Sequence, residues 1–211
     1  HILGFSDLMR SGAILENITD YADLIYNSSH NLLEIIEDIF ELALAEQSEI
    51  KLRLQTFSCL DLFISNKEAL NEILEISGKK EQIELVFSAN KELLLQTITS
   101  DRNKINQVLI NLFKNAVKFT KSGRIEFGLK KDIPGWLTFF VEDSGIGIPK
   151  EKHKLIFEFF RQADDTYTRE YGGVGIGLAI SQKIAEVMQG TLSVVSHPGK
   201  GSRFIFRIPV S

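Results

Sequence analysis

The sequence has 211 residues, 44% hydrophobic and 25% charged, a balance typical of one globular domain with a helical appendage rather than of a disordered chain. Its net charge of -4 argues against a nucleic-acid-binding surface and against direct membrane contact, since either would need a basic excess. The single cysteine, Cys59, allows neither an internal disulfide nor a cysteine metal cluster, and no apolar run reaches the length of a transmembrane helix. We expect a soluble, cytoplasmic segment.

Residues 1–50 are predicted to form two helical pieces, over about 2–9 and 17–47. The apolar positions of the second piece follow gaps of seven, four, three and four, a seam typical of a helix packed in a bundle: Ile25, Leu32, Ile36, Ile39 and Ala43. Such a helical hairpin buries little by itself, so it needs a second copy to close a four-helix core. The sequence therefore predicts a homodimer formed through the N-terminal helices.

After residue 49 shorter segments follow. Residues 51–57 alternate with a period near two, as a half-buried strand does, and a helix over 60–76 ends at Ser77 and Gly78. The next predicted elements are, in chain order, strands 83–87 and 94–99, a helix 102–119, strands 124–130 and 136–142, a helix 178–189, and strands 191–196 and 202–208. Strands paired in hairpins with helices on one face make an α+β two-layer sandwich. The stretch of about 145–177, with a short helix over 150–158, is long enough to predict a functional loop or lid.

One polar row stands out on the helix 102–119. Asn111, Asn115 and Lys118 are four and three residues apart, so they stack on one face, away from the core stripe. Two amide oxygens, which are hard ligands for Mg²⁺, and one ammonium could hold a metal-bound triphosphate. A solvated polar face explains this helix equally well when it is taken alone.

Two glycine-containing segments add to this row. Asp143 ends a predicted strand and is followed by Gly145 and Gly147, so its carboxylate could accept a hydrogen bond from an exocyclic amine beside a flat ring. The glycine-rich residues 172–177 open directly into a helix, where backbone N–H groups suit phosphate oxygens. Neither a Rossmann fingerprint nor a P-loop fits the second segment, because no βαβ unit surrounds it and no Gly-Lys-Ser/Thr closes it.

Taken in order, these motifs resemble the N, G1, F and G2 boxes of sensor histidine kinases. The four motifs are the row from Asn111 to Thr120, the turn 143–147, the aromatic segment 157–160 and the loop 172–177. The likeness covers about 51–209 and implies the two-layer α/β sandwich known as the Bergerat or GHKL ATP-binding fold. Residues 2–9 also resemble the stretch just after the family's phospho-acceptor motif, and 25–47 its second dimerisation helix. The resemblance divides the chain into truncated dimerisation and phosphotransfer helices, 1–50, and a catalytic ATP-binding domain, 51–211.

The resemblance also implies roles for individual residues, with ATP and Mg²⁺ as cofactors. Asn115 and Asn111 would hold Mg²⁺, and Lys118 would contact the phosphates. Asp143 would bind the adenine amino group, and Ser202 stands where the family usually has Thr or Ser beside the adenine. The adenine pocket would be shaped further by Gly145, Gly147 and Ile148.

For the phosphate side and its lid, the resemblance implies a second set. The lid is anchored by the loop residues Gly173, Val174, Gly175, Ile176, Gly177 and Leu178, and is packed by Phe157 and Phe160. Either Arg161 or Arg169 would reach the γ-phosphate. Val174 replaces a common Thr, which removes a hydroxyl but leaves the glycine backbone intact, so we expect binding to survive.

The choice between a kinase and a hydrolase depends on Asn111. Gyrase, mismatch-repair and chaperone ATPases of the same fold typically carry a water-activating Glu at this position, and an amide cannot act as that general base. Phosphoryl transfer to a positioned histidine, followed by relay to a response-regulator receiver domain, fits better. A regulatory nucleotide-binding module without transfer activity, a pseudokinase, is the alternative.

None of the four histidines matches the family's acceptor motif. His1 and His30 lie in the helical part, His153 is predicted to be an exposed residue of the 150–158 helix, and His197 a turn residue. Because the sequence also begins without Met, we expect a fragment whose acceptor histidine lies upstream, so that it binds ATP but does not phosphorylate itself. A membrane-anchored parent protein is compatible with this expectation.

Overall fold

The computed structural model describes residues 3–4, 6–7, 19–26, 28–29, 32–33, 36, 51–130, 133–159 and 175–210. Every described residue before position 37 is helical, which agrees with the predicted N-terminal helices where it can be compared. In this single chain, the seam residues Leu32 and Ile36 are 49% and 54% exposed. Ile39, Ala43, His1 and His30 lie outside the described residues.

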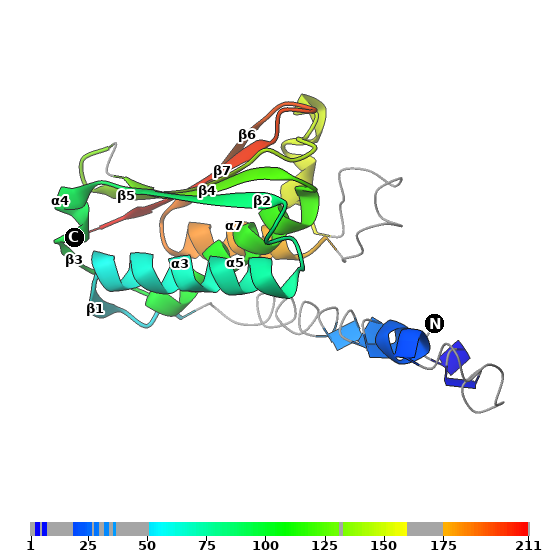
Figure 1. Cartoon of the computed structure of the whole chain (residues 1–211). Helices are drawn as coiled ribbons and strands as arrows, with labels where there is room; N and C mark the ends of the chain where they lie inside the picture. The colour runs from blue at the N-terminus through cyan, green and yellow to red at the C-terminus, as the bar shows by residue number, and fades with distance from the viewer. Residues whose placement is uncertain are drawn as a thin grey trace.

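The rest of the described chain forms two layers (Figure 1). A five-stranded sheet has the order β2-β4-β5-β7-β6, and three long helices cover one of its faces. The strands are β2 (Ile83–Ala89), β4 (Gly123–Lys130), β5 (Trp136–Asp143), β7 (Ser202–Pro209) and β6 (Thr191–Ser196). The helices are α3 (Cys59–Ile76), α5 (Arg102–Phe119) and α7 (Gly177–Val187). The predicted α+β two-layer sandwich is confirmed.

The core lies between the sheet and these helices. Leucine and isoleucine are its most numerous residues, and its largest fully buried side chains are Phe113, Phe127, Phe139 and Phe206. Phe113 of α5 meets Phe127 of β4 edge to face, with ring centroids 5.2 Å apart, and Phe139 stacks on Phe206 at 5.8 Å. The predicted stripe of α5 is buried along its length: Ile105, Val108, Leu109, Leu112 and Ala116. This burial leaves the polar row of Asn111, Asn115 and Lys118 on a different face of α5, where the site is expected.

Pairing within the sheet differs from the prediction at one edge. β2 pairs with β4 in parallel, with Ile83 opposite Gly123, whereas β4, β5, β7 and β6 are antiparallel neighbours. A parallel pair needs a crossover, and here it runs through α4 (Lys91–Leu94), β3 (Thr97–Ser100) and α5. The expectation that the strands pair in hairpins was therefore wrong for β2, and also for the pair β5 and β7, which are not consecutive in the chain.

Three predicted elements are also corrected. The strand predicted over 51–57 begins only at Gln55. It is β1 (Gln55–Ser58), which pairs with β3 in a separate two-stranded sheet. Before it, the N–H of Arg53 donates to a carboxylate oxygen of Asp101 (2.8 Å). Leu94 ends the short helix α4, so the strand predicted from 94 begins at Thr97. The predicted helix 150–158 is two 3₁₀ turns, η2 (Lys150–Lys152) and η3 (Leu155–Phe157).

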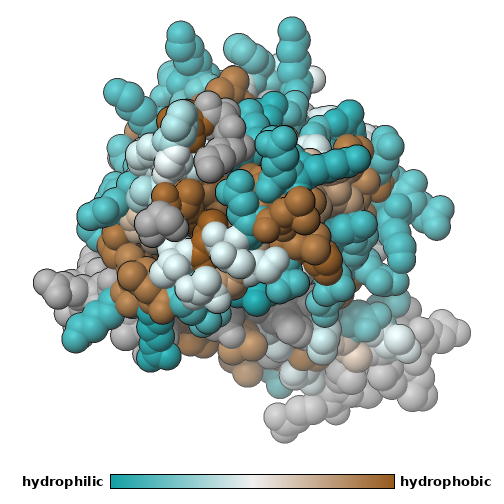
Figure 2. All heavy atoms as spheres, turned by 90° about the vertical axis from the view of Figure 1, so that its left-hand side faces the viewer, coloured by the Kyte–Doolittle hydropathy of each residue, from teal (hydrophilic) through white to brown (hydrophobic). Residues whose placement is uncertain are grey.

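Apolar side chains gather on the end of the molecule where α4, β1 and β3 lie (Figure 2). Leu95 is 87% exposed and Leu54 66% exposed in this region. No helix among the described residues combines the length and the apolar character that crossing a bilayer requires.

Candidate functional site

The polar face of α5 lies against the beginning of α7. Asn111, Asn115 and Lys118 are all half-buried on α5. The amide Nδ2 of Asn111 donates a hydrogen bond to the Ser181 hydroxyl of α7 (2.9 Å). This bond fixes the orientation of the amide and leaves its Oδ1, the atom suited to a hard cation, on the side of Gly177.

Gly177 opens α7 because the two helices meet at this point. A Cβ on Gly177 would lie 2.4 Å from the Asn111 Oδ1, so any larger residue would displace the Asn111 amide. No described side chain hydrogen-bonds to the first turn of α7, whose flanking residue is Ile176. The backbone N–H groups at this helix start therefore remain suited to an anion, beside the amide row of α5.

Asp143 is a buried carboxylate at the end of β5, only 7% exposed. Its Oδ1 accepts the N–H of Gly145 (2.9 Å). Burial raises the pKa of the Asp143 carboxyl to about 6; the backbone N–H groups of Gly145 and Ser202 oppose this shift, and the charge of Glu142 adds to it. A strongly desolvated carboxylate without a cationic partner among these causes is poised to accept a hydrogen bond from a ligand.

Close backbone contacts fix the turn that follows Asp143. A Cβ on Gly145 would meet the Phe119 carbonyl oxygen at 2.3 Å, and one on Gly147 the His197 carbonyl oxygen at 2.0 Å. The N–H of Ile146 donates to the Phe119 carbonyl (3.3 Å), so this turn is hydrogen-bonded to the end of α5. Gly147 also has a φ of 70°, which favours glycine. The turn 143–147 is thus held between α5 and the β6–β7 hairpin.

Ser196 is a buried residue of this region that the sequence analysis did not identify. Its hydroxyl lies 3.0 Å from the Ser202 hydroxyl, donates to the Gly201 carbonyl (2.8 Å) and accepts the N–H of Ile148 (2.7 Å). Ser202 itself is 7% exposed, one strand away from Asp143. A lone serine near the end of a strand carries no sequence signal for this role, because the contacts come from three separated segments.

The structure thus brings together the predicted residues of α5, the turn 143–147, Ile148, Ser202 and the segment 175–178. His153 is half-buried rather than exposed: its Nε2 lies 3.1 Å from the Ile148 carbonyl oxygen. His197 is an exposed turn residue, as predicted, and Phe157 packs against the core. Five of the predicted lid residues lie outside the described residues: Phe160, Arg161, Arg169, Gly173 and Val174.

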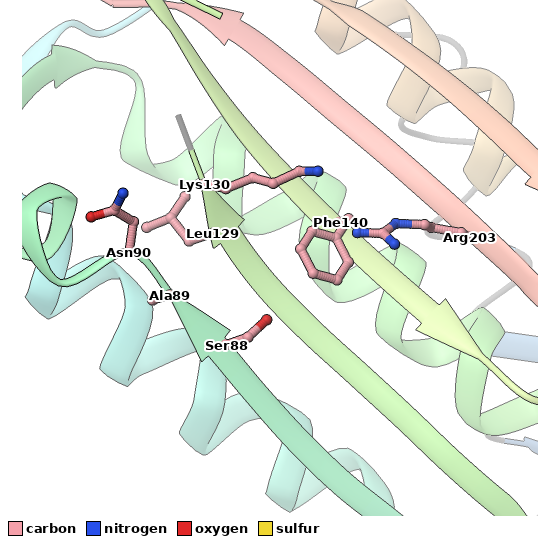
Figure 3. A pocket seen from close by; sticks show the side chains of 7 residues that line it. All are labelled: Ser88, Ala89, Asn90, Leu129, Lys130, Phe140 and Arg203. Carbon is pink, nitrogen blue, oxygen red and sulfur yellow. The ribbon is translucent and has the colours of Figure 1, made fainter. Parts of the chain in front are cut away.

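A separate hollow of about 260 Å³ lies on the other face of the sheet (Figure 3). Ser88, Lys130, Phe140 and Arg203 have their side chains on this face, and the Arg203 guanidinium stacks over the Phe140 ring at 3.9 Å. Arg203 also forms an ion pair with Glu142 (3.0 Å). None of the predicted nucleotide-site residues lines this hollow.

Comparison with known proteins shows which family this chain belongs to. The model of the family described as histidine kinase-, DNA gyrase B-, and HSP90-like ATPase matches residues 100–211, about half of the chain. The autoinducer 2 sensor kinase/phosphatase LuxQ of Vibrio vulnificus is 36% identical over 216 residues, which cover 99% of this chain. The chain spans only 24% of the length of that relative.

Two solved structures resemble the whole chain. Full-length ShkA in complex with AMPPNP has a TM-score of 0.77 at 27% identity, and the match covers 100% of this chain and 42% of that chain. The histidine kinase ThkA in complex with the response regulator protein TrrA has a TM-score of 0.76 at 27% identity, covering 100% of this chain and 57% of that chain.

Proposed function

The chain belongs to the family of histidine kinase-, DNA gyrase B- and HSP90-like ATPases, as a catalytic domain of the sensor histidine kinase kind, and from this premise we propose that it binds Mg-ATP between α5, the turn 143–147 and the start of α7. The observation that carries the proposal is Asp143, a buried carboxylate with a raised pKa in a turn that Gly145 and Gly147 allow to pack closely against Phe119 and His197. Its carboxylate would accept a hydrogen bond from the adenine amino group, beside Ser202. Gly145 and Gly147 would shape the adenine pocket by holding this turn in place.

The triphosphate would then extend along the polar face of α5 towards α7. Lys118 would contact the phosphates, and the N–H groups at the start of α7 would bind their oxygens. Asn115 and Asn111 would hold Mg²⁺ through their amide oxygens; the fixed amide of Asn111 fits this use, since its Nδ2 is already engaged by Ser181. Bound there, the cation would neutralise phosphate charge during transfer.

The reaction we propose is transfer of the γ-phosphoryl group to a histidine that lies upstream of these 211 residues. A neutral imidazole nitrogen attacks the γ-phosphorus, the bond to the β–γ bridging oxygen breaks, and ADP leaves while the imidazole loses its other N–H proton. An amide at position 111 supports transfer over hydrolysis, because it cannot activate water as a general base. Relay to a receiver domain is the partner reaction, by analogy with the ThkA–TrrA complex.

Calorimetric titration of the non-hydrolysable analogue AMPPNP with Mg²⁺ tests the nucleotide site. We expect Asp143→Asn to weaken binding at least tenfold, and Glu142→Gln to leave it within about twofold. Glu142 is the matched control, because it neighbours Asp143 in sequence but faces Arg203 on the other side of the sheet. If both variants bound Mg-AMPPNP as tightly as the unaltered chain, Asp143 would not belong to the nucleotide site.

Transfer is tested separately from binding. A longer chain that includes the upstream histidine should acquire acid-labile phosphate from ATP, whereas the present 211 residues should bind ATP without being phosphorylated. Phosphohistidine on the 211-residue chain would show that the acceptor is not upstream. Binding without transfer by the longer chain would favour the pseudokinase alternative.

A further inference from the structure

The carbonyl end of α5 is capped from outside the helix. The last-turn carbonyls of a helix have no partners within it, and each needs a donor when it is shielded from water. The N–H of Thr120 donates to Ala116, and the N–H of Ile146 donates to Phe119. The remaining carbonyls of this stretch, those of Val117, Lys118 and Thr120, all accept from one side chain.

That side chain is Lys79, on the loop between α3 and β2. Its Nζ lies 2.6 Å from the Val117 carbonyl oxygen, 3.0 Å from that of Thr120 and 3.3 Å from that of Lys118. An ammonium group has three donors, and three acceptors surround this one. Its positive charge also lies at the negative end of the α5 dipole, where a cation stabilises the helix.

The loop that carries Lys79 is itself fixed to the sheet. The Lys79 carbonyl accepts the N–H groups of Gln82 and Ile83 (3.0 and 3.1 Å), and the Gln82 carbonyl accepts that of Gly123 (2.9 Å). Partial burial and the neighbouring charge of Lys121 lower the pKa of Lys79, so the amine is held in this place against a desolvation penalty. The contact therefore connects a rigid part of the sheet to the end of α5.

We propose that Lys79 is a positioning residue of the nucleotide site: its ammonium holds the end of α5 so that Lys118 and Phe119 stay in register with the turn 143–147. The backbone carbonyl of Lys118 contacts Lys79 directly, and that of Phe119, between the Lys79-bound carbonyls, contacts Ile146. Loss of the cap would free both the phosphate-binding side chain and the support of the adenine turn. The inference rests on the proposed function of this site.

The test compares Lys79→Met with Lys80→Met. Lys80 is the matched control, because it neighbours Lys79 on the same loop but makes only an exposed ion pair with Glu75. Calorimetry with Mg-AMPPNP, well below the unfolding temperature, should give about tenfold weaker binding for Lys79→Met and less than twofold for Lys80→Met. Lys79→Arg, which keeps the charge and several donors, should recover most of the affinity. An unchanged affinity in Lys79→Met, whatever its Tm, overturns the positioning role.

Hydrogen exchange of the nucleotide-free protein gives a second readout that does not depend on ATP. We expect faster amide exchange in Lys79→Met than in Lys80→Met, both in 116–122 and in 143–148, because the two segments share the Phe119–Ile146 bond. Faster exchange confined to 116–122 would overturn the proposed coupling. If the unaltered chain fails to bind nucleotide while exchange rises in both segments, the proposed function is wrong and the mechanical link remains.

Discussion

The negative charge of Asp143 has opposite effects on binding and on stability. It would bind adenine, but it is unfavourable to the folded protein without nucleotide. Its pKa is raised to about 6 from 3.8, chiefly by burial. A carboxyl with a raised pKa in the folded state favours folding when protonated, and this contribution is lost as pH rises through about 6. At neutral pH the ionised side chain therefore destabilises the nucleotide-free protein.

It follows that Asp143→Asn should weaken nucleotide binding and stabilise the free protein. The shift corresponds to at most about 3 kcal/mol at pH 7.5, and the gain should fall to about 1 kcal/mol at pH 4.5, since it vanishes only below the unfolded pKa of 3.8. Urea denaturation of both proteins between pH 4.5 and 8 measures the difference. A difference that does not vary with pH would mean that the carboxylate is not desolvated as the structure indicates.

Gly147 and Gly199 have nearly equal φ angles but different surroundings, so substituting each by alanine distinguishes steric contact from backbone strain. Gly147 has φ 70° and Gly199 φ 73°, but a Cβ on Gly147 would lie 2.0 Å from the His197 carbonyl oxygen, whereas nothing lies within 4 Å of one on Gly199. Gly199→Ala should lower the free energy of unfolding by about 1 kcal/mol, from backbone strain alone. Gly147→Ala should lower the free energy of unfolding by at least twice as much. Urea denaturation of the two variants measures both changes. Equal effects would contradict the close contact.

Much of the site could be predicted at this scale, because the residues concerned form short motifs with regular spacing. The row Asn111, Asn115 and Lys118 follows helical periodicity, and the helix 102–119 was predicted with its observed bounds. Ser181, Ser196 and Lys79 could not be predicted in the same way. Each acts through partners 38 to 70 residues away along the chain, or through a turn whose geometry depends on the fold.

Among the elements, α3 and α5 both begin with a capping side chain, but the two caps accept different hydrogen bonds. Ser58 accepts N–H groups from Leu60 and Asp61 in its own first turn. Asp101, only 3% exposed, accepts that of Lys104 and also that of Arg53, 48 residues away. Asp101 therefore fastens the segment before β1 to the start of the nucleotide-site helix.

We expect Ser58→Ala to lower the free energy of unfolding by about 1 kcal/mol, as for an ordinary helix cap. Asp101→Ala should lower it by about 2–4 kcal/mol, because it also leaves the Arg53 N–H without its acceptor. Denaturant titrations of the two variants under identical conditions provide the comparison. Losses of the same size would mean that the bond to Arg53 contributes nothing.

The elements that sequence patterns predicted poorly are those that depend on a distant partner. Residues 51–54 alternate like a strand, yet Asp101 binds the Arg53 backbone and pairing starts only at Gln55. The segment 150–158 has a helical composition, but the two 3₁₀ turns bury Ile156 and place His153 against Ile148. Amphipathic helices with long apolar stripes, such as α5, were predicted well because their own core contacts determine them.

For the whole molecule, the members of the hydrophobic core that belong to the described part of the chain all lie from Leu52 onward. We therefore expect a chain of residues 51–211 to fold alone and to bind Mg-AMPPNP with the affinity of the full 211 residues. The full chain should be a dimer and the shorter one a monomer in sedimentation, since the exposed Leu32 and Ile36 belong to the N-terminal seam. A dimeric 51–211 chain, or a monomeric full chain, would contradict this division of roles.

The order of the strands was the global feature that no local pattern contained. Alternation can locate β6 and β7, but it does not place β7 between β5 and β6, nor β2 parallel to β4. These choices depend on how all the strands share one core, with the crossover through α5 covering the sheet.

That strand order also has a consequence for protein synthesis. β7 follows β6 in the chain, yet it is an interior strand, whereas β6 is an edge strand that pairs with β7 alone among the described strands. During synthesis on the ribosome, β6 can therefore pair within the sheet only after β7 has emerged. Until then, β5 lacks one of its two neighbouring strands. Nascent chains arrested before residue 202 would expose the unpaired edge of β5, a template for aggregation and a substrate for chaperones. Domain completion in the cell is thus tied to the release of residues 202–209 rather than to gradual folding from the N-terminus.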